Sequence, residues 1–499
     1  RAVKDGEAIW IHGDYDVDGT ASTAMLLLFL REIGGKVGYF IPDRFTDGYG
    51  LSINSINAAK KKNSKLLITV DVGINSYEPL EYARSIGMET IICDHHEPGE
   101  AIPEVFAILD PIKGNCDYPF KYLSACGVTF KLVQALAITL GCPEKAYEYL
   151  DFVAIASAAD MVPLVGENRI LSYYGLDNLN TAPRPGIRGL IECTNLKLGT
   201  ISASSIVYAL APLINAAGRL GDASRAVEMM AQSDELTSFR IAQELEQDNR
   251  RRRAFDERTF EEAIPMAEKM IEEGNCRSLV IHKPDWHAGV IGIVASRLVD
   301  RFHLPTVLLT TIDGKAKGSA RSIINFDIHS ALRKSSRLLI EYGGHKHAAG
   351  LTLDESNIAQ FRKEIDEIAR QHISDDMLVP EILIDSPLEL KELSPNFLNI
   401  LRKFAPFGFE NYKPIFISYN VTSANGVRIV GNNHLKFRAF QSNFAIDAIA
   451  YNLGHKINIC SGKKPFSIVY HIEESSFSGY PTIQLRVKDI APSDELPMI

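Results

Sequence analysis

Four side chains that could bind a metal ion lie close together near the start of the chain. The segment His12-Gly-Asp14-Tyr-Asp16-Val-Asp18-Gly19 places three carboxylates and one imidazole in a single turn. Like charges this close repel one another strongly unless a cation or a proton neutralises them. Oxygen and imidazole ligands without thiolate suit Mn²⁺ or Mg²⁺ better than a structural zinc site. A solvated Asp-rich turn, in which Gly19 supplies a positive φ, is the alternative interpretation.

The same residue types recur at the ends of apolar runs further along the chain. Runs over 66–70, 90–93 and 105–109 read as buried strands that end on aspartates, and a small-residue helical run over 152–159 also ends on one. These side chains are Asp71, Asp94 with His95 and His96, Asp110, and Asp160. Because the carboxyl ends of parallel strands share one edge of a sheet, the side chains can converge there. We therefore favour a metal cluster over a set of unrelated turns.

Three kinds of element pattern follow one another along the chain. Strands alternating with helices over residues 1–160 predict a mainly parallel α/β sheet. A charged segment over 223–273 has helical periodicity and predicts a long connecting helix, which Pro265 should kink or break. A second α/β unit follows over 277–370. From residue 380, short β-rich runs separated by turn residues predict a small antiparallel barrel.

Charge is distributed unevenly along the 499 residues, a length that predicts roughly two to four domains. Residues 1–160 contain 22 Asp and Glu against 14 Lys and Arg. Residues 277–350 contain 5 Asp and Glu against 11 Lys and Arg, and residues 401–499 contain 7 Asp and Glu against 11 Lys and Arg. An acidic first part followed by basic segments suits a metal site beside a phosphate-binding surface. Random drift of surface charge is the alternative.

Cysteine usage and hydropathy bear on the compartment. The seven cysteines are dispersed and include no C-x-x-C pair, which is typical of reduced thiols in a cytoplasmic protein. No uninterrupted apolar run is long enough to span a membrane, so we expect no membrane association.

Two later segments have the composition of anion-binding sites. Arg219 follows Ala217-Gly218, where a phosphate could meet both backbone and guanidinium. Gly318-Ser319-Ala-Arg321 reads as a strand that carries a hydroxyl and a guanidinium, and glycine-rich 342–350 permits close backbone approach to an anion. A surface ion pair for Arg219, and a loop that merely needs glycine, are the alternatives.

The ordered set of motifs resembles the DHH phosphoesterase superfamily. The motifs that carry the resemblance are His12-x-Asp14-x-Asp16-x-Asp18-Gly, Asp71-x-Gly73, Asp94-His95-His96 and Ala159-Asp160. Further segments are most similar to the RecJ single-strand exonuclease branch of that superfamily. They are Pro42-x-Arg44 with Gly48-Tyr49-Gly50-Leu51, Asn215-Ala-Ala-Gly218-Arg219, Trp286-His287-x-Gly289-Val-Ile-Gly292, Gly318-Ser319-x-Arg321-Ser322 and Gly343-Gly344-His345. The resemblance runs from near residue 8 to about residue 455 and covers most of the chain.

The resemblance implies a role for each matched residue. It implies two divalent cations, with Mn²⁺ favoured over Mg²⁺, bridged by Asp71. The implied metal ligands are His12, Asp16, Asp18, Asp71, His95 and Asp160, with Asp14 in a supporting position. His96 would face the scissile phosphate, and Asp94 would orient a neighbouring imidazole. The implied DNA- and phosphate-binding residues are Arg44, Asn215, Arg219, Ser319, Arg321, Gly344 and His345.

The resemblance also implies the domain organisation. Residues 1–221 would form the DHH catalytic domain and 222–275 the connecting helix. Residues 276–376 would form the DHH-associated phosphate-binding domain, and 377–499 an OB-fold that binds single strands by stacking and backbone charge. Candidate contacts there are Phe407, Phe409, Phe437, Phe440 and Lys436, although aromatic residues of a small barrel more often form its core.

The implied function is 5′→3′ exonuclease action on single-stranded DNA with a free 5′ end, releasing 5′-mononucleotides in DNA repair and recombination. A single-strand-binding protein and a helicase are the partners that such a role suggests. One alternative is a phosphoesterase of short oligonucleotides or cyclic dinucleotides, against which the β-rich segment after residue 380 argues. Another is a non-catalytic DNA-binding scaffold, against which the filled acidic positions argue.

Overall fold

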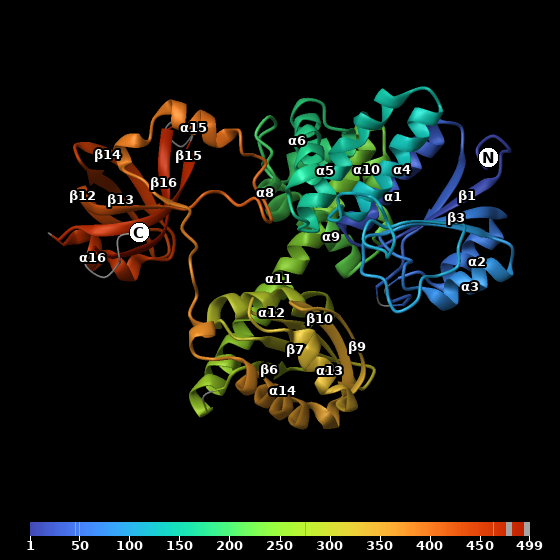
Figure 1. The fold of residues 1–499 in the computed structure, drawn as a ribbon. Helices are drawn as coiled ribbons and strands as arrows, with labels where there is room; N and C mark the ends of the chain where they lie inside the picture. The colour runs from blue at the N-terminus through green and yellow to red at the C-terminus, as the bar shows by residue number, and fades with distance from the viewer. Residues whose placement is uncertain (45, 49, 275, 463, 476–481, 494–499) are drawn as a thin grey trace. The chain divides into compact units, whose positions relative to one another are not determined.

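The chain consists of two compact units, Arg1–Pro380 and Glu381–Ile499. The computed structural model shown in Figure 1 describes residues 1–44, 46–48, 50–274, 276–462, 464–475 and 482–493. The first unit contains two α/β domains joined by a long helix, and the second is a small β-barrel with a core of its own.

A five-stranded parallel sheet begins the first unit. The strands lie in the order β2-β1-β3-β4-β5, and every neighbouring pair is parallel. Their bounds are β1 (Ala8–Gly13), β2 (Lys36–Phe40), β3 (Ser64–Val70), β4 (Glu89–Cys93) and β5 (Ala107–Leu109). The predicted parallel sheet is confirmed. Its strand order reverses between β1 and β3, the position at which open α/β sheets bind ligands.

Helices cover both faces of this sheet (Figure 1). On one face, α1 (Val17–Glu32), α4 (Ala125–Thr139) and α5 (Leu150–Ala159) share a core with Ile9 and Ile11 of β1. On the other face, α2 (Ile53–Lys61) and α3 (Tyr77–Ser85) pack with Trp10 of the same strand. Since successive side chains of a strand point to opposite faces, each residue of β1 is assigned to one of the two helical layers.

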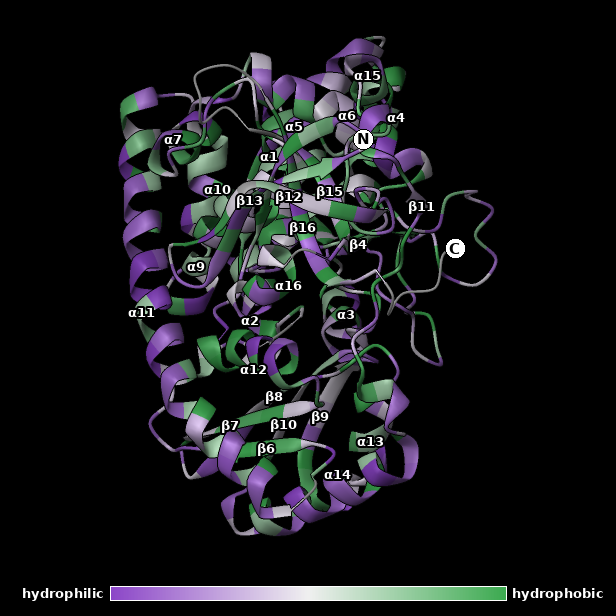
Figure 2. Cartoon of the chain, turned by 90° about the vertical axis from the view of Figure 1, so that its left-hand side faces the viewer, coloured by the Kyte–Doolittle hydropathy of each residue, from purple (hydrophilic) through white to green (hydrophobic). Residues whose placement is uncertain are grey.

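Further helices complete the first domain and connect it to the second. They are η1 (Pro143–Tyr149), α6 (Gly166–Thr181), α7 (Pro185–Cys193), α8 (Ala203–Ser205), η2 (Ile206–Leu210), α9 (Ala211–Leu220) and α10 (Ser224–Ala231). The connecting helix α11 (Glu235–Gly274) contacts α7, α9 and α12. Figure 2 shows α11 as largely hydrophilic along its length, as expected for a helix that packs along one narrow stripe.

The prediction that Pro265 breaks the connecting helix is wrong, because α11 continues through it to Gly274. A proline in a helix removes one N–H donor and leaves the carbonyl four residues earlier without its usual partner. Pro265 is exposed, and so is Glu261, whose carbonyl would have accepted that bond. Water can therefore satisfy the freed carbonyl, and the packed face of the helix is not interrupted.

The second domain of this unit is built on a mixed sheet in the order β6-β7-β8-β10-β9, in which β6 and β7 are parallel and the other pairs antiparallel. The strands are β6 (Leu279–His282), β7 (Thr306–Ile312), β8 (Lys315–Arg321), β9 (Leu339–His345) and β10 (Ala348–Asp354). The helices are α12 (Ala288–Phe302), α13 (Ile328–Lys334) and α14 (Ile358–His372), with short turns η3 (Ser336–Leu338) and η4 (Glu355–Asn357). The core that contains α12 also includes Ala263 and Ala267 of α11, which fixes the domain to the connecting helix.

The second unit is a closed barrel in which β12 pairs with both β13 and β15. Its strands are β11 (Ser386–Pro387), β12 (Phe416–Val430), β13 (His434–Gln441), β14 (Phe444–Ala450), β15 (Phe466–Ser475) and β16 (Thr482–Pro492). Its helical segments are η6 (Leu390–Glu392), α15 (Pro395–Arg402), η7 (Gly454–Lys456) and α16 (Ile457–Ser461), and η5 (Asp376–Leu378) precedes the unit.

Two expectations about this barrel need correction. It is not wholly antiparallel, because β14 and β16 are parallel neighbours. Phe437 is buried in the barrel core and is not available as a nucleic-acid contact. Phe409 is exposed, and Phe407, Phe440 and Lys436 are partly exposed, so these four stay candidates.

None of the helices in the described part of the chain is both long and apolar enough to cross a bilayer.

Candidate active site

The carboxyl edge of the first sheet carries most of the predicted acidic residues. The turn after β1 provides Asp14 and Asp16, the first turn of α1 provides Asp18, and the residue after β3 is Asp71. β4 is followed directly by Asp94, His95 and His96. Asp160 is the C-cap residue of α5, as the sequence predicted.

Backbone hydrogen bonds fix the turn after β1. Asp16 is the N-cap of α1, and its carboxylate accepts a hydrogen bond from the Gly19 N–H at 3.0 Å. The two oxygens of the buried Asp18 accept the N–H groups of Ala125 (2.8 Å) and Cys126 (2.7 Å) in the first turn of α4. A negative charge is favoured at a helix N-terminus, where free N–H groups point outward. The start of α4 therefore holds Asp18 in place.

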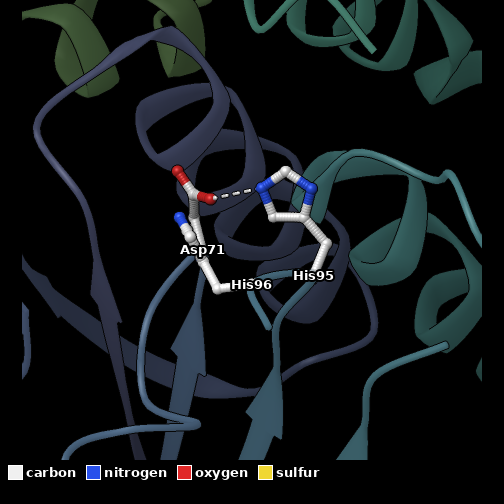
Figure 3. Close-up of side chains that lie close together, drawn as sticks. All are labelled: Asp71, His95 and His96. Carbon is white, nitrogen blue, oxygen red and sulfur yellow. Dashed lines mark ion pairs between the residues drawn. The ribbon is translucent and has the colours of Figure 1, made fainter. Parts of the chain in front are cut away.

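Asp71 and His95 face each other across the ends of β3 and β4 (Figure 3). Oδ1 of Asp71 lies 3.4 Å from Nε2 of His95. The same imidazole nitrogen lies 3.7 Å from Oδ2 of Asp160 and 3.9 Å from Oδ2 of Asp18. Residues from three elements that are distant in sequence thus surround one ring nitrogen.

Three overlapping groups of side chains have the geometry of metal-ligand sets. Within each group, one potential ligand atom per residue lies within 4.8 Å of all the others. The groups are Asp14, Asp16 and Asp71; Asp71, His95 and His96; and Asp18, His95 and Asp160. Asp71 belongs to two of the groups and His95 to two, so the groups form one continuous cluster. A shared carboxylate between neighbouring ligand sets is the arrangement that a pair of cations requires.

The electrostatics of the cluster favour a bound cation. Burial raises the pKa of Asp14 to about 8 and that of Asp18 to about 7, and the charge of Asp16 adds to both shifts. Burial and neighbouring carboxylates also raise the pKa values of Asp71 and Asp160 well above the usual range. Oδ1 of Asp14 is buried and has no hydrogen-bond partner among the described residues. A divalent cation would satisfy this oxygen and offset the repulsion, so the oxygen-rich donor set fits Mn²⁺ or Mg²⁺.

His95 and His96 are placed in opposite protonation states. Burial and the charge of His96 lower the pKa of His95 to about 4, so His95 is neutral and has a ring lone pair to offer a metal ion. Burial alone would lower the pKa of His96, but its hydrogen bond to Asp94 and the charge of that carboxylate raise it to about 9. Nδ1 of His96 lies 2.7 Å from Oδ1 of Asp94. His96 is therefore a charged donor with a fixed orientation.

Several hydrogen bonds besides the one to the His96 ring hold the carboxylate of Asp94 in place. Its Oδ1 also accepts the N–H groups of His95 (2.8 Å) and His96 (3.2 Å), and its Oδ2 accepts that of Ile74 (3.0 Å). Burial would raise the pKa of Asp94, but these bonds and the charge of His96 hold it below its usual value. The carboxylate thus holds the His96 ring in one orientation.

His12 lies apart from these groups. Its Nδ1 is 2.7 Å from Oγ of Ser55, and its Nε2 is 3.3 Å from the carbonyl oxygen of Gly50. Among the described residues, the three candidate ligand groups include Asp14 and not His12. The structure thus brings the residue expected to support the site into the cluster, and gives the expected ligand other partners.

A cavity of about 320 Å³ opens beside the carboxylates. Its lining residues are Asp14, Tyr15, Asp16, Arg44, Asp71, His96, Ala159, Asp160, Asn215, Gly218 and Arg219. The guanidinium of Arg44 lies over the ring of Tyr15, 4.5 Å from its centroid. Asn215 and Arg219 are one helical turn apart on α9 and reach the cavity from the same face of that helix. One wall is therefore acidic and another carries guanidinium groups.

Arg219 connects this cavity with the second domain. Its Nη1 donates a hydrogen bond of 3.1 Å to the carbonyl of Gly289 in the first turn of α12. Burial, together with the charges of Arg44, Arg252 and Arg321, lowers the pKa of Arg219 to about 10. Three other guanidinium groups are therefore near enough to destabilise the charge of Arg219, and a bound anion beside it would relieve the repulsion.

Ser319 and Arg321 lie together on β8. Nη1 of Arg321 donates to Oγ of Ser319 at 2.9 Å. A Cβ atom on Gly292 of α12 would come within 2.8 Å of that Oγ and 2.9 Å of Nη2 of Arg321. The absence of a side chain at Gly292 therefore leaves room for both groups beside the helix. Gly292 and Tyr15 were not identified from the sequence as functional, although both lie inside motifs that were.

The remaining candidates lie elsewhere. Gly344 and His345 are exposed at the end of β9, next to the turn into β10, and do not line the cavity. Gly344 has a φ of 136°, and a Cβ atom there would come within 2.5 Å of the Ala348 carbonyl oxygen, so the hairpin itself requires glycine. Asp110 is buried after β5 with one oxygen unpaired, and burial raises its pKa to about 6.

Comparison with protein-family models agrees with this arrangement of parts. The DHH family N-terminal domain matches residues 8–157, the DHHA1 domain matches 275–371, and the RecJ OB domain matches 384–489. The fold and the matched domains thus define a DHH-family protein with an added OB domain.

Comparison with individual proteins assigns the chain to a narrower family. The chain is 34% identical over 99% of its length to the single-stranded-DNA-specific exonuclease RecJ of Salmonella typhimurium and covers 89% of that protein. It is 35% identical to the protein of the same name from Bacillus subtilis, again over 99% of this chain, but it spans only 62% of that relative. The crystal structure of Thermus thermophilus RecJ in complex with Mn²⁺ matches 98% of this chain and 69% of that chain, with a TM-score of 0.85 and 30% identity. This chain belongs to the RecJ family.

Proposed function

We propose that this protein is a metal-dependent exonuclease that degrades single-stranded DNA from a free 5′ end. The observation that carries the proposal is the position of Arg219. Arg219 lines the acidic cavity and donates a hydrogen bond to the carbonyl of Gly289 in the second domain. The positive charge of Arg321, which lies beside Ser319, contributes to the lowered pKa of Arg219. The proposed cation-binding cluster and the proposed anion-binding site would therefore lie on either side of one arginine, as a phosphodiester substrate with a terminal phosphate requires.

The acidic cluster would hold two divalent cations, with Mn²⁺ favoured and Mg²⁺ as the alternative. We assign their ligands to Asp14, Asp16, Asp18, Asp71, His95 and Asp160, with Asp71 shared, and we replace His12 by Asp14. When bound, such a pair supplies a hydroxide near neutral pH and stabilises both oxygens of the displacement. The neutral state of His95 and the unpaired oxygen of Asp14 support this assignment.

His96 would act on the phosphate itself. It lines the cavity, and Asp94 keeps it protonated and oriented. A charged imidazole that donates to a non-bridging phosphate oxygen stabilises the charge that develops there. Arg44, Asn215 and Arg219, on the other walls, would hold the neighbouring backbone phosphates.

Ser319 and Arg321 would bind the terminal 5′-phosphate. If this pocket lies one nucleotide from the cations, only a free 5′ end can fill it, and the strand would be shortened stepwise in the 5′→3′ direction with release of 5′-mononucleotides. Gly344 and His345, on the exposed hairpin, would contact the strand outside the cavity.

Each part of the chain has a role in this function. Residues 1–221, 222–275, 276–376 and 377–499 would act as catalytic domain, connecting helix, phosphate-binding domain and single-strand-binding barrel. We place the protein in the cytoplasm, in DNA repair and recombination, with a single-strand-binding protein and a helicase as partners.

The test is degradation of end-labelled single-stranded DNA with Mn²⁺, comparing linear strands with and without a 5′-phosphate and a circular strand. We expect stepwise mononucleotide release from the linear strands and none from the circle. Equal cleavage of the circle would contradict the exonuclease. Faster hydrolysis of a dinucleotide than of a long strand would instead favour a phosphoesterase of short substrates.

A further inference from the structure

The imidazole of His12 connects the loop over residues 41–52 of the first domain to the central sheet. His12 is fully buried on β1. It lies two residues after Trp10, whose side chain packs in the layer formed by α2 and α3. Because strand side chains alternate, His12 points into the same layer and away from the core shared by Ile11 and α1. Its partners Ser55 and Gly50 lie in and just before α2, which agrees with this direction.

The two hydrogen bonds of His12 determine its tautomer. A neutral imidazole has one N–H donor and one acceptor nitrogen, and the two partners of the His12 ring decide which nitrogen has which role. The carbonyl of Gly50 can only accept, so Nε2 carries the proton and donates to it. Nδ1 then accepts the hydroxyl proton of Ser55. With one nitrogen protonated and the other occupied, the ring has no lone pair to offer a cation.

The contacts of His12 bracket the loop over residues 41–52. Its ring stacks on Phe40, the last residue of β2, with centroids 5.7 Å apart and planes 16° apart. Gly50 is near the other end of the loop, and Ser55 is in the first turn of α2. One side chain on β1 therefore contacts the residue before the loop, a residue near its end and the helix that follows.

That loop carries Arg44 to the cavity. Hydrogen bonds from the Asp43 N–H to Asp47 and from the Thr46 N–H to Asp43 fold the loop on itself. Arg44 leaves this folded segment and lies over Tyr15 in the cavity wall. The position of its guanidinium thus depends on how the ends of the loop are anchored.

We propose that His12 is a positioning residue that fixes Arg44 for substrate binding, and not a metal ligand. This inference rests on the proposed function, because it concerns how that site holds its strand. It predicts that the loss of His12 affects affinity for the strand and leaves the requirement for metal unchanged.

The experiment compares His12→Phe, which keeps the stacking but removes both hydrogen bonds, with Arg44→Ala and with the double variant. With Mn²⁺ and a 5′-phosphorylated single-stranded oligonucleotide, we expect His12→Phe to raise KM about tenfold and to change kcat less than about threefold. The half-saturating Mn²⁺ concentration should stay at the wild-type value. In the Arg44→Ala background, His12→Phe should raise KM no further, because the residue through which it acts is gone.

Two further variants guard against a chain that does not fold. Ser55→Ala removes one of the two bonds and should raise KM about threefold, again only when Arg44 is present. His12→Gln retains an amide donor for Gly50 and should recover most of the lost affinity. The same ranking should appear in fluorescence-anisotropy affinities measured in EDTA, where no cation is bound.

Specific outcomes would overturn the proposal. A tenfold rise in half-saturating Mn²⁺, or a loss of kcat at unchanged KM, would make His12 a metal ligand. An undiminished effect on KM in the Arg44→Ala background would show that His12 does not act through Arg44. A wild-type chain that neither binds nor cleaves single strands would instead refute the proposed function, which is a different result from an active wild type with additive variants.

Discussion

Asp71 is the residue on which the proposed metal-binding cluster depends most. It is buried, belongs to two of the three candidate ligand groups, and lies 3.4 Å from His95. Its φ of 64° turns the chain sharply after β3, and the Asp71 N–H donates to Cys93 on the neighbouring strand. Aspartate and asparagine tolerate this backbone conformation better than most residues, so the backbone allows an asparagine substitution.

We therefore predict that Asp71→Asn folds but loses at least about 10³-fold in kcat, because a neutral amide cannot serve as the shared ligand of two cations. Steady-state assays over a range of Mn²⁺ concentrations would measure this. Asp151→Asn is the matched control, since Asp151 is equally buried but pairs with Arg184 at 2.8 Å and does not line the cavity. That variant should lose stability and keep kcat; a loss of kcat as large as that of Asp71→Asn would contradict the assignment.

At the scale of elements, the first turn of α12 limits the space around the anion-binding residues. Its N-cap His287 accepts the Gly289 N–H, and Gly289 accepts from Arg219. Gly292, about one turn further, leaves the room that Ser319 and Arg321 occupy. The helix thus contributes to this site by leaving space where Gly292 has no side chain.

Gly292→Ala should weaken substrate binding without lowering the stability of the fold. Alanine favours a helix interior by about 1 kcal/mol over glycine, so the fold should not be weakened. The new Cβ atom would come within 2.8 Å of Ser319 Oγ and 2.9 Å of Arg321 Nη2, so both side chains must shift. We expect KM for a 5′-phosphorylated strand to rise about tenfold, with a smaller effect on a strand that has a 5′-hydroxyl. Gly274→Ala, where a Cβ atom meets nothing within 4 Å, is the control and should leave both values unchanged.

The contact between α11 and the loop after β6 should depend on pH. Glu262 accepts hydrogen bonds from Lys283 (2.8 Å), Trp286 (2.9 Å) and Arg258 (3.1 Å), and these bonds lower its pKa to about 2. A carboxylate whose pKa is lower in the folded than in the unfolded chain stabilises the fold above the unfolded value, and this contribution is lost as the pH falls toward the folded value.

Glu262→Gln should therefore lower the thermal midpoint at pH 7, and the difference from wild type should shrink between about pH 4.5 and pH 2. Scanning calorimetry of both proteins across that range measures it. Glu261→Gln, on the exposed side of the same helix, should show no such trend. A difference between wild type and Glu262→Gln that stayed constant with pH would show that the charge of Glu262 is not what stabilises the contact.

The sequence could predict elements and their order because local patterns determine them. Apolar runs that end on Asp71, Asp94 and Asp110 gave the strands of a parallel sheet, and parallel strands bring those ends to one edge. The sequence could not predict that Ser55 and Gly50 would be the hydrogen-bond partners of His12, because these contacts depend on how α2 and the segment before it pack against the sheet. The parallel pairing of β14 with β16 was likewise missed, since it joins strands separated by another strand and is set by barrel closure.

At the scale of the whole molecule, chemistry and strand binding are assigned to separate units. The cation cluster and the guanidinium groups lie in Arg1–Pro380, and the barrel of Glu381–Ile499 has a core of its own. Residues 401–499 contain 11 Lys and Arg against 7 Asp and Glu, which suits a surface that follows a phosphate backbone.

Removal of the second unit should therefore reduce activity according to substrate length. We expect residues 1–380 to hydrolyse a 5′-phosphorylated trinucleotide with a kcat/KM within about threefold of the full chain, since so short a substrate fits the catalytic unit alone. On a long single strand, kcat/KM should fall about 10- to 100-fold, because the barrel no longer stacks on bases or binds phosphates outside the cavity. The dependence of log KM on log salt concentration should also become shallower, by about 0.7 for each phosphate that the barrel neutralises in the full chain. Parallel assays on both substrates over a range of NaCl concentrations measure these effects. A truncated chain that is folded by circular dichroism but fails to hydrolyse the trinucleotide would show that the barrel contributes to the chemical step itself.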